Sequence, residues 1–123
     1  TDDAKGLYIV KDGNWYYNDV KMSKVINTQN YTLITKDIAY NLRLTLDIPG
    51  VTHQVTIPSG LFQKDHIIDI FQEGSSKIEF VAAQGMNLII SERYPLRRTS
   101  GKTSEVRIRF TSPTEAVITG GLE

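Results

Sequence analysis

Apolar residues recur at every second position in several short stretches of this chain, and this alternation restricts its fold more than any other feature. It runs through residues 41–47, 77–80 and 105–110. Side chains of a β-strand point alternately to opposite faces, so each stretch would bury one face and expose the other. Turn signals separate these stretches at short intervals, among them Pro49-Gly50, Pro58-Ser59-Gly60, Ser100-Gly101 and Ser112-Pro113. The pattern predicts an all-β chain folded as an antiparallel β-sandwich.

Composition divides the chain into two parts. In residues 7–17, two runs of strand-forming residues flank Asp12-Gly13, a strong hairpin signal because glycine tolerates the positive φ of a tight turn. The segment 18–30 is polar and is expected to be a connector. We therefore expect an N-terminal β-hairpin segment with its connector in residues 1–30 and a β-sandwich domain in residues 31–123. Because it does not begin with Met, the chain is expected to be a piece of a longer protein.

Gly74-Ser75-Ser76, with acids on both sides and His66 upstream, is the stretch in which to look for a serine nucleophile. A nucleophile elbow has Gly-x-Ser-x-Gly between a strand and a helix, whereas here the serines directly follow the glycine and a strand follows them. His53, the other histidine, is expected on the outer face of its strand. A small hydrolase would need one of these histidines beside a serine and a second acid. We predict instead a hairpin turn between antiparallel strands, no catalytic residue and no enzymatic activity.

The composition also argues against several kinds of ligand. There is no Cys, and the cluster of Asp65, His66 and Asp69 does not match the spacing of a known metal motif, so no metal is expected. No glycine-rich loop opens a helix, so no nucleotide cofactor is expected. Lys plus Arg and Asp plus Glu are 14 each, and zero net charge argues against a nucleic-acid partner. No apolar run is long enough to span a bilayer, so membrane insertion is not expected.

Positive charge is concentrated in the last third of the chain. Arg93, Arg97 and Arg98 follow one another closely, and Arg107 and Arg109 alternate with apolar residues, so the last two should share the outer face of a strand. Three interpretations are open: a solvated face balanced by nearby acids, a contact with a neighbouring chain, or a site for an anionic glycan or nucleic acid. Zero net charge favours the first two.

Aromatic residues cluster in the N-terminal quarter. Trp15 and Tyr17 would share one face of a strand, with Tyr16 on the other. Such side chains fill a local core or a subunit contact, or they form a platform that binds a glycan. Packing is favoured, since burial is the commoner role of large aromatic residues.

Five short pieces occur in order along most of the chain: Tyr31-Thr32-Leu33, Val55-Thr56-Ile57-Pro58, Gln72-Glu73-Gly74, Ala82-Ala83-Gln84-Gly85 and Gly120-Gly121-Leu122. Each piece alone is ordinary strand and turn chemistry. In this order and spacing they resemble a small β-domain that recurs in virion proteins of tailed bacteriophages, in tail fibres, tail spikes and baseplate wedge proteins.

The resemblance implies a non-catalytic structural module that connects or docks modules in the virion and supports host attachment. It implies a homotrimer that has other virion proteins as partners, is assembled in the cytoplasm of the bacterial host and resides in the phage tail. Residues 93–102 are longer than in the simplest members of the family, which leaves a docking or receptor role for this loop open. The competing interpretation is a carbohydrate-binding module that recognises a host-surface glycan.

Overall fold

The computed structural model describes the backbone of residues 2–3, 6–11, 14–17 and 20–123, and side chains from Lys21 onward. This part of the chain is all-β, as predicted, with one short 3-10 segment. The elements are β1 (Asp2–Asp3), β2 (Gly6–Lys11), β3 (Asn14–Tyr17), β4 (Val20–Lys21), β5 (Ser23–Ile26), β6 (Asn30–Thr32), η1 (Thr35–Ala39), β7 (Asn41–Leu44), β8 (His53–Ile57), β9 (Ile67–Gln72), β10 (Ile78–Ala82), β11 (Asn87–Ile89), β12 (Glu105–Ser112) and β13 (Glu115–Gly120). Across the described ranges, no helix has the length and apolar character that a membrane crossing requires.

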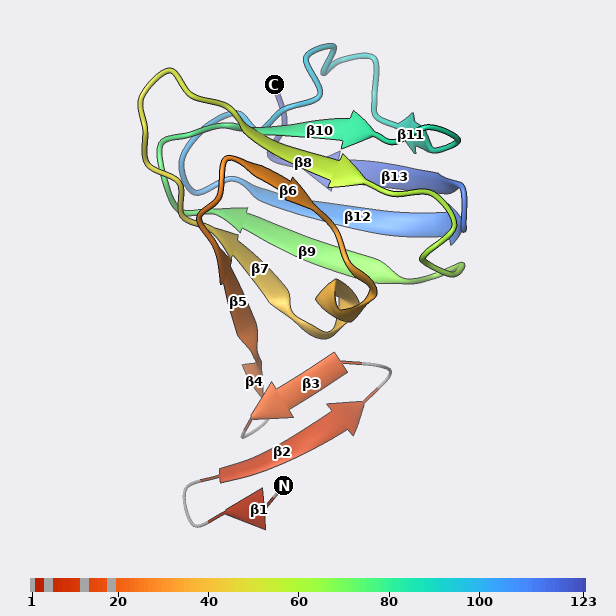
Figure 1. The fold of residues 1–123 in the computed structure, drawn as a ribbon. Helices are drawn as coiled ribbons and strands as arrows, with labels where there is room; N and C mark the ends of the chain where they lie inside the picture. The colour runs from red at the N-terminus through yellow and green to blue at the C-terminus, as the bar shows by residue number, and fades with distance from the viewer. Residues whose placement is uncertain (1, 4–5, 12–13, 18–19) are drawn as a thin grey trace.

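From β5 to β10 the chain winds as a coil that resembles a β-solenoid (Figure 1). The strands β5, β7 and β9 lie in parallel in a six-stranded sheet, and β6, β8 and β10 lie in parallel in a facing three-stranded sheet. Each turn of the coil therefore adds one strand to each sheet. After β10, β12 pairs antiparallel with β9, and β13 lies between β12 and the edge strand β11.

The predicted antiparallel sandwich is wrong in its strand pairing. Among the named strands of the two facing sheets, only the pairs β12–β9 and β12–β13 are antiparallel, and the remaining pairs are parallel. Alternation shows which face of a strand is buried, but not which strand lies beside it. The sequence predicts a hairpin at residues 72–76, whereas this segment carries the chain from β9 in one sheet to β10 in the other.

The strands β1 to β4 form a separate antiparallel sheet that projects from one end of the facing sheets (Figure 1). The predicted N-terminal hairpin is confirmed, because β2 pairs with β3 and sets Val10 opposite Trp15. Its Asp12-Gly13 turn lies outside the described residues. Residues 23–26, placed in the connector by composition, form β5 at the edge of the larger sheet. The two-sheet body therefore includes residues before 31.

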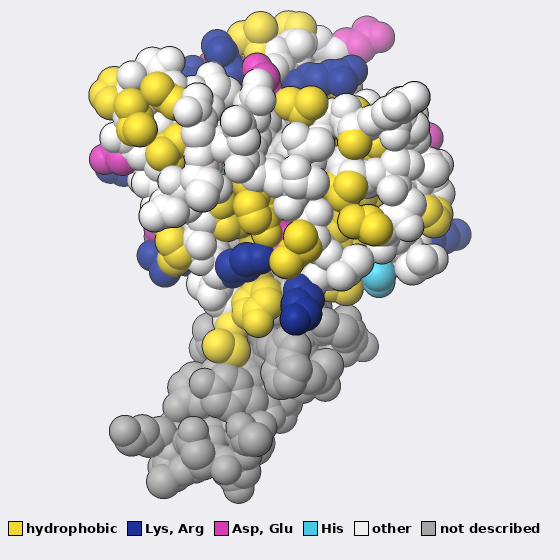
Figure 2. Space-filling model, viewed as in Figure 1, with side chains coloured by type: hydrophobic (Ala, Val, Ile, Leu, Met, Phe, Trp, Pro, Cys, Tyr) yellow, Lys and Arg dark blue, Asp and Glu magenta, His cyan; other side chains and the backbone are white. Residues whose placement is uncertain are grey.

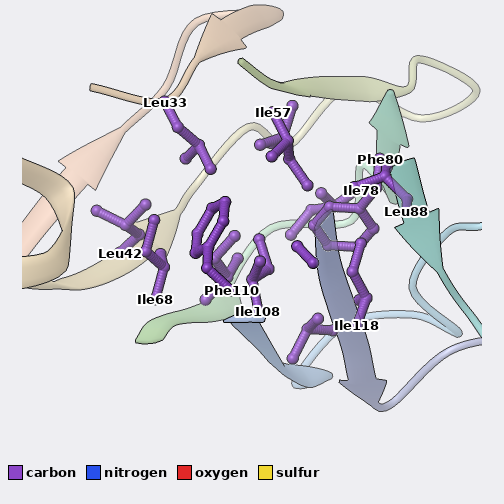
Figure 3. Packing of buried hydrophobic residues seen from close by; sticks show 14 of the residues in the cluster. Leu33, Leu42, Ile57, Ile68, Ile78, Phe80, Leu88, Ile108, Phe110 and Ile118 are labelled. Carbon is purple, nitrogen blue, oxygen red and sulfur yellow. The ribbon is translucent and has the colours of Figure 1, made fainter. Parts of the chain in front are cut away.

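The two facing sheets share one hydrophobic core. Ile78, Phe80, Val106, Ile108 and Phe110 are buried, as the alternation in residues 77–80 and 105–110 predicts. Figure 3 shows side chains from both sheets converging on the space between them. Full burial of such side chains contributes about 1.5–3 kcal/mol each, so this shared core is what holds the sheets together. The buried cluster comprises Ile26, Leu33, Leu42, Leu44, Val55, Ile57, Phe62, Ile68, Ile70, Ile78, Phe80, Met86, Leu88, Val106, Ile108, Phe110, Ala116, Ile118 and Leu122.

His53 lies on the core side of β8, although the sequence analysis predicts it on the outer face. It shares strand parity with Val55 and Ile57, and all three side chains are buried. Neither ring nitrogen of His53 has a hydrogen-bond partner in the described part of the chain. Burial lowers the pKa of His53, because a charged imidazole is costly away from water. Strand parity, rather than the polarity of the side chain, decides which face this residue occupies.

This buried histidine predicts that acid destabilises the fold. An unfolded-state histidine has a pKa of about 6.5, and the folded-state pKa of His53 is lower. Below about pH 6.5, His53 binds a proton in the unfolded chain but stays neutral in the folded chain, so the free energy of unfolding falls as the pH falls. Above about pH 6.5, His53 is neutral in both states and its contribution to the free energy of unfolding is constant. Urea unfolding from about pH 5 to pH 8 measures this dependence.

Two variants isolate the contribution of His53. His53→Leu removes the titrating group and should flatten the fall in unfolding free energy below about pH 6.5. His66→Gln removes a partly exposed histidine and should keep the fall. An unaltered fall in His53→Leu would contradict the prediction.

Candidate functional site

A groove of about 660 Å³ crosses the outer face of the six-stranded sheet. Its floor is formed by β7, β9, β12 and β13. Ligand sites usually have volumes of roughly 300–1,000 Å³, so the groove is large enough to hold a small molecule or part of a polymer. The opposite face of the molecule, over β6, β8 and β10, is mostly uncharged where Figure 2 shows it. Charged side chains in that view lie mainly toward its borders.

A first row of groove side chains runs across four strands. The register places Asn41 of β7, Asp69 of β9, Arg107 of β12 and Thr119 of β13 beside one another. Arg107 Nε donates a hydrogen bond to Asp69 Oδ1 at 2.9 Å, and this bond raises the pKa of Arg107. The two side chains are 54% and 34% exposed. Such a pair contributes little to stability, but it fixes the orientation of a guanidinium and a carboxylate.

A second row contains the aromatic residue of the groove. The register aligns Arg43 of β7, Phe71 of β9 and Glu105 of β12. Arg43 donates from Nε to Glu73 Oε1 at 2.9 Å and from Nη2 to Glu73 Oε2 at 3.0 Å. A bidentate pair of this kind holds both planar groups in one orientation. Phe71 is half-buried and lies on the face of β9 opposite the core residue Ile70, so its ring supplies apolar surface to the groove.

Lys21, at the end of β4, lies close enough to Asp69 and Arg107 of the first row for their charges to act on its ammonium group. Burial lowers the pKa of Lys21, nearby Asp69 opposes this effect, and Arg107 adds to it. With Lys21 included, the formal charges around the groove cancel. The cations are Lys21, Arg43 and Arg107, and the acids are Asp69, Glu73 and Glu105.

The structure separates the arginines that the sequence analysis selected. Arg107 lies in the groove. Arg109 is exposed two positions further along β12, opposite Ile67 of β9 and Val117 of β13. Arg93, Arg97 and Arg98 lie instead in the loop between β11 and β12, which passes along the edge of β10. The side chains of Trp15 and Tyr17 lie outside the described residues, so their favoured packing role and the alternative glycan platform both stay predictions.

Part of the β11–β12 loop is fastened to the body. Phe80 N donates to Arg97 O, and Thr99 N donates to Ile78 O, both at 2.9 Å. The buried hydroxyl of Thr99 also bonds to Gln72. Arg98 pairs with Glu123, which accepts a second bond from Lys77 Nζ at 2.7 Å, and these bonds lower the pKa of Glu123. Of the loop arginines, Arg93 and Arg97 are therefore the exposed ones.

The Gly74-Ser75-Ser76 segment is bonded to the loop after β7. The buried Ser76 Oγ donates to Ile48 O at 2.9 Å and accepts from Ile48 N at 3.0 Å. Ser75 N donates to Asp47 Oδ1 at 3.0 Å, and hydrogen bonds from Ser75 lower the pKa of Asp47. Both serines thus shape a loop. Over the residues that the structure describes, no group of three or more His, Asp and Glu is placed to hold a metal ion.

Sequence reasoning found only part of the groove. Among the residues selected from the sequence, Arg107 lies in the groove. Sequence reasoning missed Asn41, Arg43 and Glu105, although their strand parity marks them as outward-facing. The missing information was the strand order, because only that order brings β7, β9 and β12 together.

Comparison with known proteins gives no assignment: the chain matches no protein-family model, no curated protein and no solved structure. Its function has to be argued from the fold, the groove and the sequence pieces.

Proposed function

We propose that this chain is a non-catalytic structural module of a phage tail fibre, tail spike or baseplate protein. It would connect or dock modules in the virion, act as a homotrimer and support attachment to the host. Its virion location and its partners follow from the five sequence pieces that resemble the phage domain. Ser75 and Ser76 shape a loop and His53 is buried in the core, in keeping with a module that has no catalytic residue.

The edge strand β5 is the observation that carries the self-association in this proposal. β5 pairs on one side with β7 and follows closely on β4 of the small N-terminal sheet. Its Val25 is 54% exposed, although it is apolar and lies in a strand. An open edge strand offers unpaired backbone groups to another chain, and proteins usually cover or block such edges. A neighbouring copy that covers β5 would explain both the exposed valine and its position at the junction between the sheets.

Light scattering across a concentration series tests this proposal. We expect the mass of a trimer of 13.9 kDa chains at the higher concentrations. Val25→Lys should shift the distribution toward one chain, because a lysine on an edge strand opposes pairing. Leu96→Lys, at an apolar residue 51% exposed in the β11–β12 loop, is the matched control and should leave the mass unchanged. The mass of a single chain at every concentration would contradict the homotrimer in this proposal.

A further inference from the structure

We propose that the groove on the six-stranded sheet binds a neutral oligosaccharide. This site lies on the described residues of β7, β9, β12 and β13, and Val25 of β5 borders it beside Arg43. It adds a binding activity to the scaffolding role, and it stands or falls separately from that role.

The charge of the groove points to an uncharged ligand. Its described lining has the cations Arg43 and Arg107 and the acids Asp69, Glu73 and Glu105, with Lys21 nearby, so the groove has no excess of positive charge. Asp69 and Glu73 already pair with Arg107 and Arg43. An anionic ligand such as a phosphate or a sulfated glycan would need an excess of positive charge to repay its desolvation. A wholly apolar ligand would leave these polar groups without water or partners. A neutral ligand rich in hydroxyl groups has no charge to desolvate, and it offers hydrogen-bond partners to the polar groups of the groove.

The polar side chains of the groove suit hydroxyl groups. A sugar hydroxyl both donates and accepts, and the groove presents donors and acceptors in held orientations. Within the described part of the chain, the Asp69–Arg107 bond uses Oδ1 and Nε, which leaves Asp69 Oδ2 and the Arg107 Nη atoms for a ligand. The amide of Asn41 lies next to Asp69 in the same row. Since the ion pair fixes these groups before binding, less conformational entropy is lost when a ligand arrives.

Phe71 supplies the apolar contact that a sugar ring requires. Its ring lies between the row neighbours Arg43 and Glu105 and faces away from the core. The C–H face of a pyranose is apolar and packs on an aromatic ring, while its hydroxyl groups reach outward to polar neighbours. An aromatic ring flanked by oriented polar groups, in a groove that spans four strands, fits several linked sugar units.

A glycan array tests this site directly. The probes are short neutral oligosaccharides of glucose, galactose, rhamnose and N-acetylglucosamine, with sulfated and sialylated oligosaccharides as the charged set. We expect retention on members of the neutral set. Phe71→Ala should weaken retention by about tenfold or more, as truncation of a central aromatic contact does. Asn41→Ala should weaken it as well.

Matched variants separate the groove from the rest of the surface. Leu96→Ala removes an exposed apolar side chain elsewhere, and Gln54→Ala removes an exposed amide on the outer face of the smaller sheet. Both should bind like the original chain, and thermal unfolding of each variant should confirm that it folds. Retention on no neutral probe, retention only on the charged set, or retention unaffected by Phe71→Ala would each overturn the proposal. If Phe71→Ala instead reduces the oligomer mass while no neutral probe binds, the groove is a subunit contact and the glycan site is excluded.

Discussion

Gly74→Ala is expected to lower the free energy of unfolding by about 3–5 kcal/mol, among the largest effects of a single methyl group on this fold. A Cβ at this position would lie 2.0 Å from Leu46 O and 2.8 Å from Thr45 O. Both atoms belong to the backbone, so no side-chain rotation can relieve the overlap. The backbone must move, and nearby hydrogen bonds resist that movement.

Hydrogen bonds on both sides hold Gly74 in this place. Gly74 N donates to Leu44 O at 3.3 Å, and Gln72 Nε2 donates to Gly74 O at 2.8 Å. Ser76 N donates to Leu46 O at 3.2 Å. Each lost bond would cost about 1 kcal/mol, and the buried amide of Gln72 would lose a partner. The estimate for Gly74→Ala therefore combines overpacking with broken bonds.

Urea unfolding with Gly50→Ala as the control distinguishes this overlap from a general effect of replacing glycine. Gly50 has φ +78°, and apart from Gly50 and its chain neighbours no heavy atom lies within 4 Å of the point where a Cβ would stand, so its substitution carries backbone strain without a clash. That strain should cost about 1–2 kcal/mol. If Gly74→Ala costs no more than Gly50→Ala, the close contact with Leu46 is not what restricts this position.

The turn at residues 74–76 is predictable from the sequence, but the segment on which it packs is not. Gly74-Ser75-Ser76 was recognisable as a turn because glycine and serine favour turns. Its partner was not recognisable, because the turn packs on residues 45–48, which are distant in sequence. The same limit applies to the pairing of β7 with β9. Alternation at Leu42 and Leu44 predicts their burial equally well beside a parallel or an antiparallel neighbour.

The candidate groove shows this limit more strongly. The parity of Arg107 can be read from its own strand, and this residue faces outward as predicted. The ion pair between Asp69 and Arg107 joins residues far apart in sequence and depends on the register of β9 with β12. No local pattern encodes that register. Binding sites built across several strands are therefore harder to predict from sequence than the strands themselves.

Asp37→Ala is expected to cost about 2–4 kcal/mol, because it removes a buried acceptor shared by three donors. Asp37 is fully buried in η1. Its Oδ1 accepts from Lys24 Nζ at 2.8 Å, and its Oδ2 accepts from Tyr31 OH at 2.8 Å and from Ile34 N at 2.9 Å. These bonds tie β5 and β6 to η1, so one carboxylate links the first turn of the coil to its connecting segment.

A graded series of variants measures how this cost is distributed. Tyr31→Phe removes one donor to Asp37 and also the acceptor of a bond from Lys24 Nζ at 2.8 Å. It should cost about 1–2 kcal/mol, since the other two bonds to Asp37 remain. Asp37→Asn keeps the shape of the side chain but loses the charge opposite Lys24, and its cost in unfolding free energy should lie between those of Tyr31→Phe and Asp37→Ala.

The environment of Lys24 limits the cost of Asp37→Ala. Burial would lower the pKa of Lys24, but its bonds to Asp37 and Tyr31 outweigh that effect and raise the pKa. Lys24 is 30% exposed, so after Asp37→Ala its ammonium can recover water, which keeps the expected loss below that of a fully buried charge. Glu92→Ala, at an exposed acid in the β11–β12 loop, should leave the urea midpoint unchanged. Equal midpoints for Asp37→Ala and Glu92→Ala would show that the buried carboxylate does not hold β5 and β6 against η1.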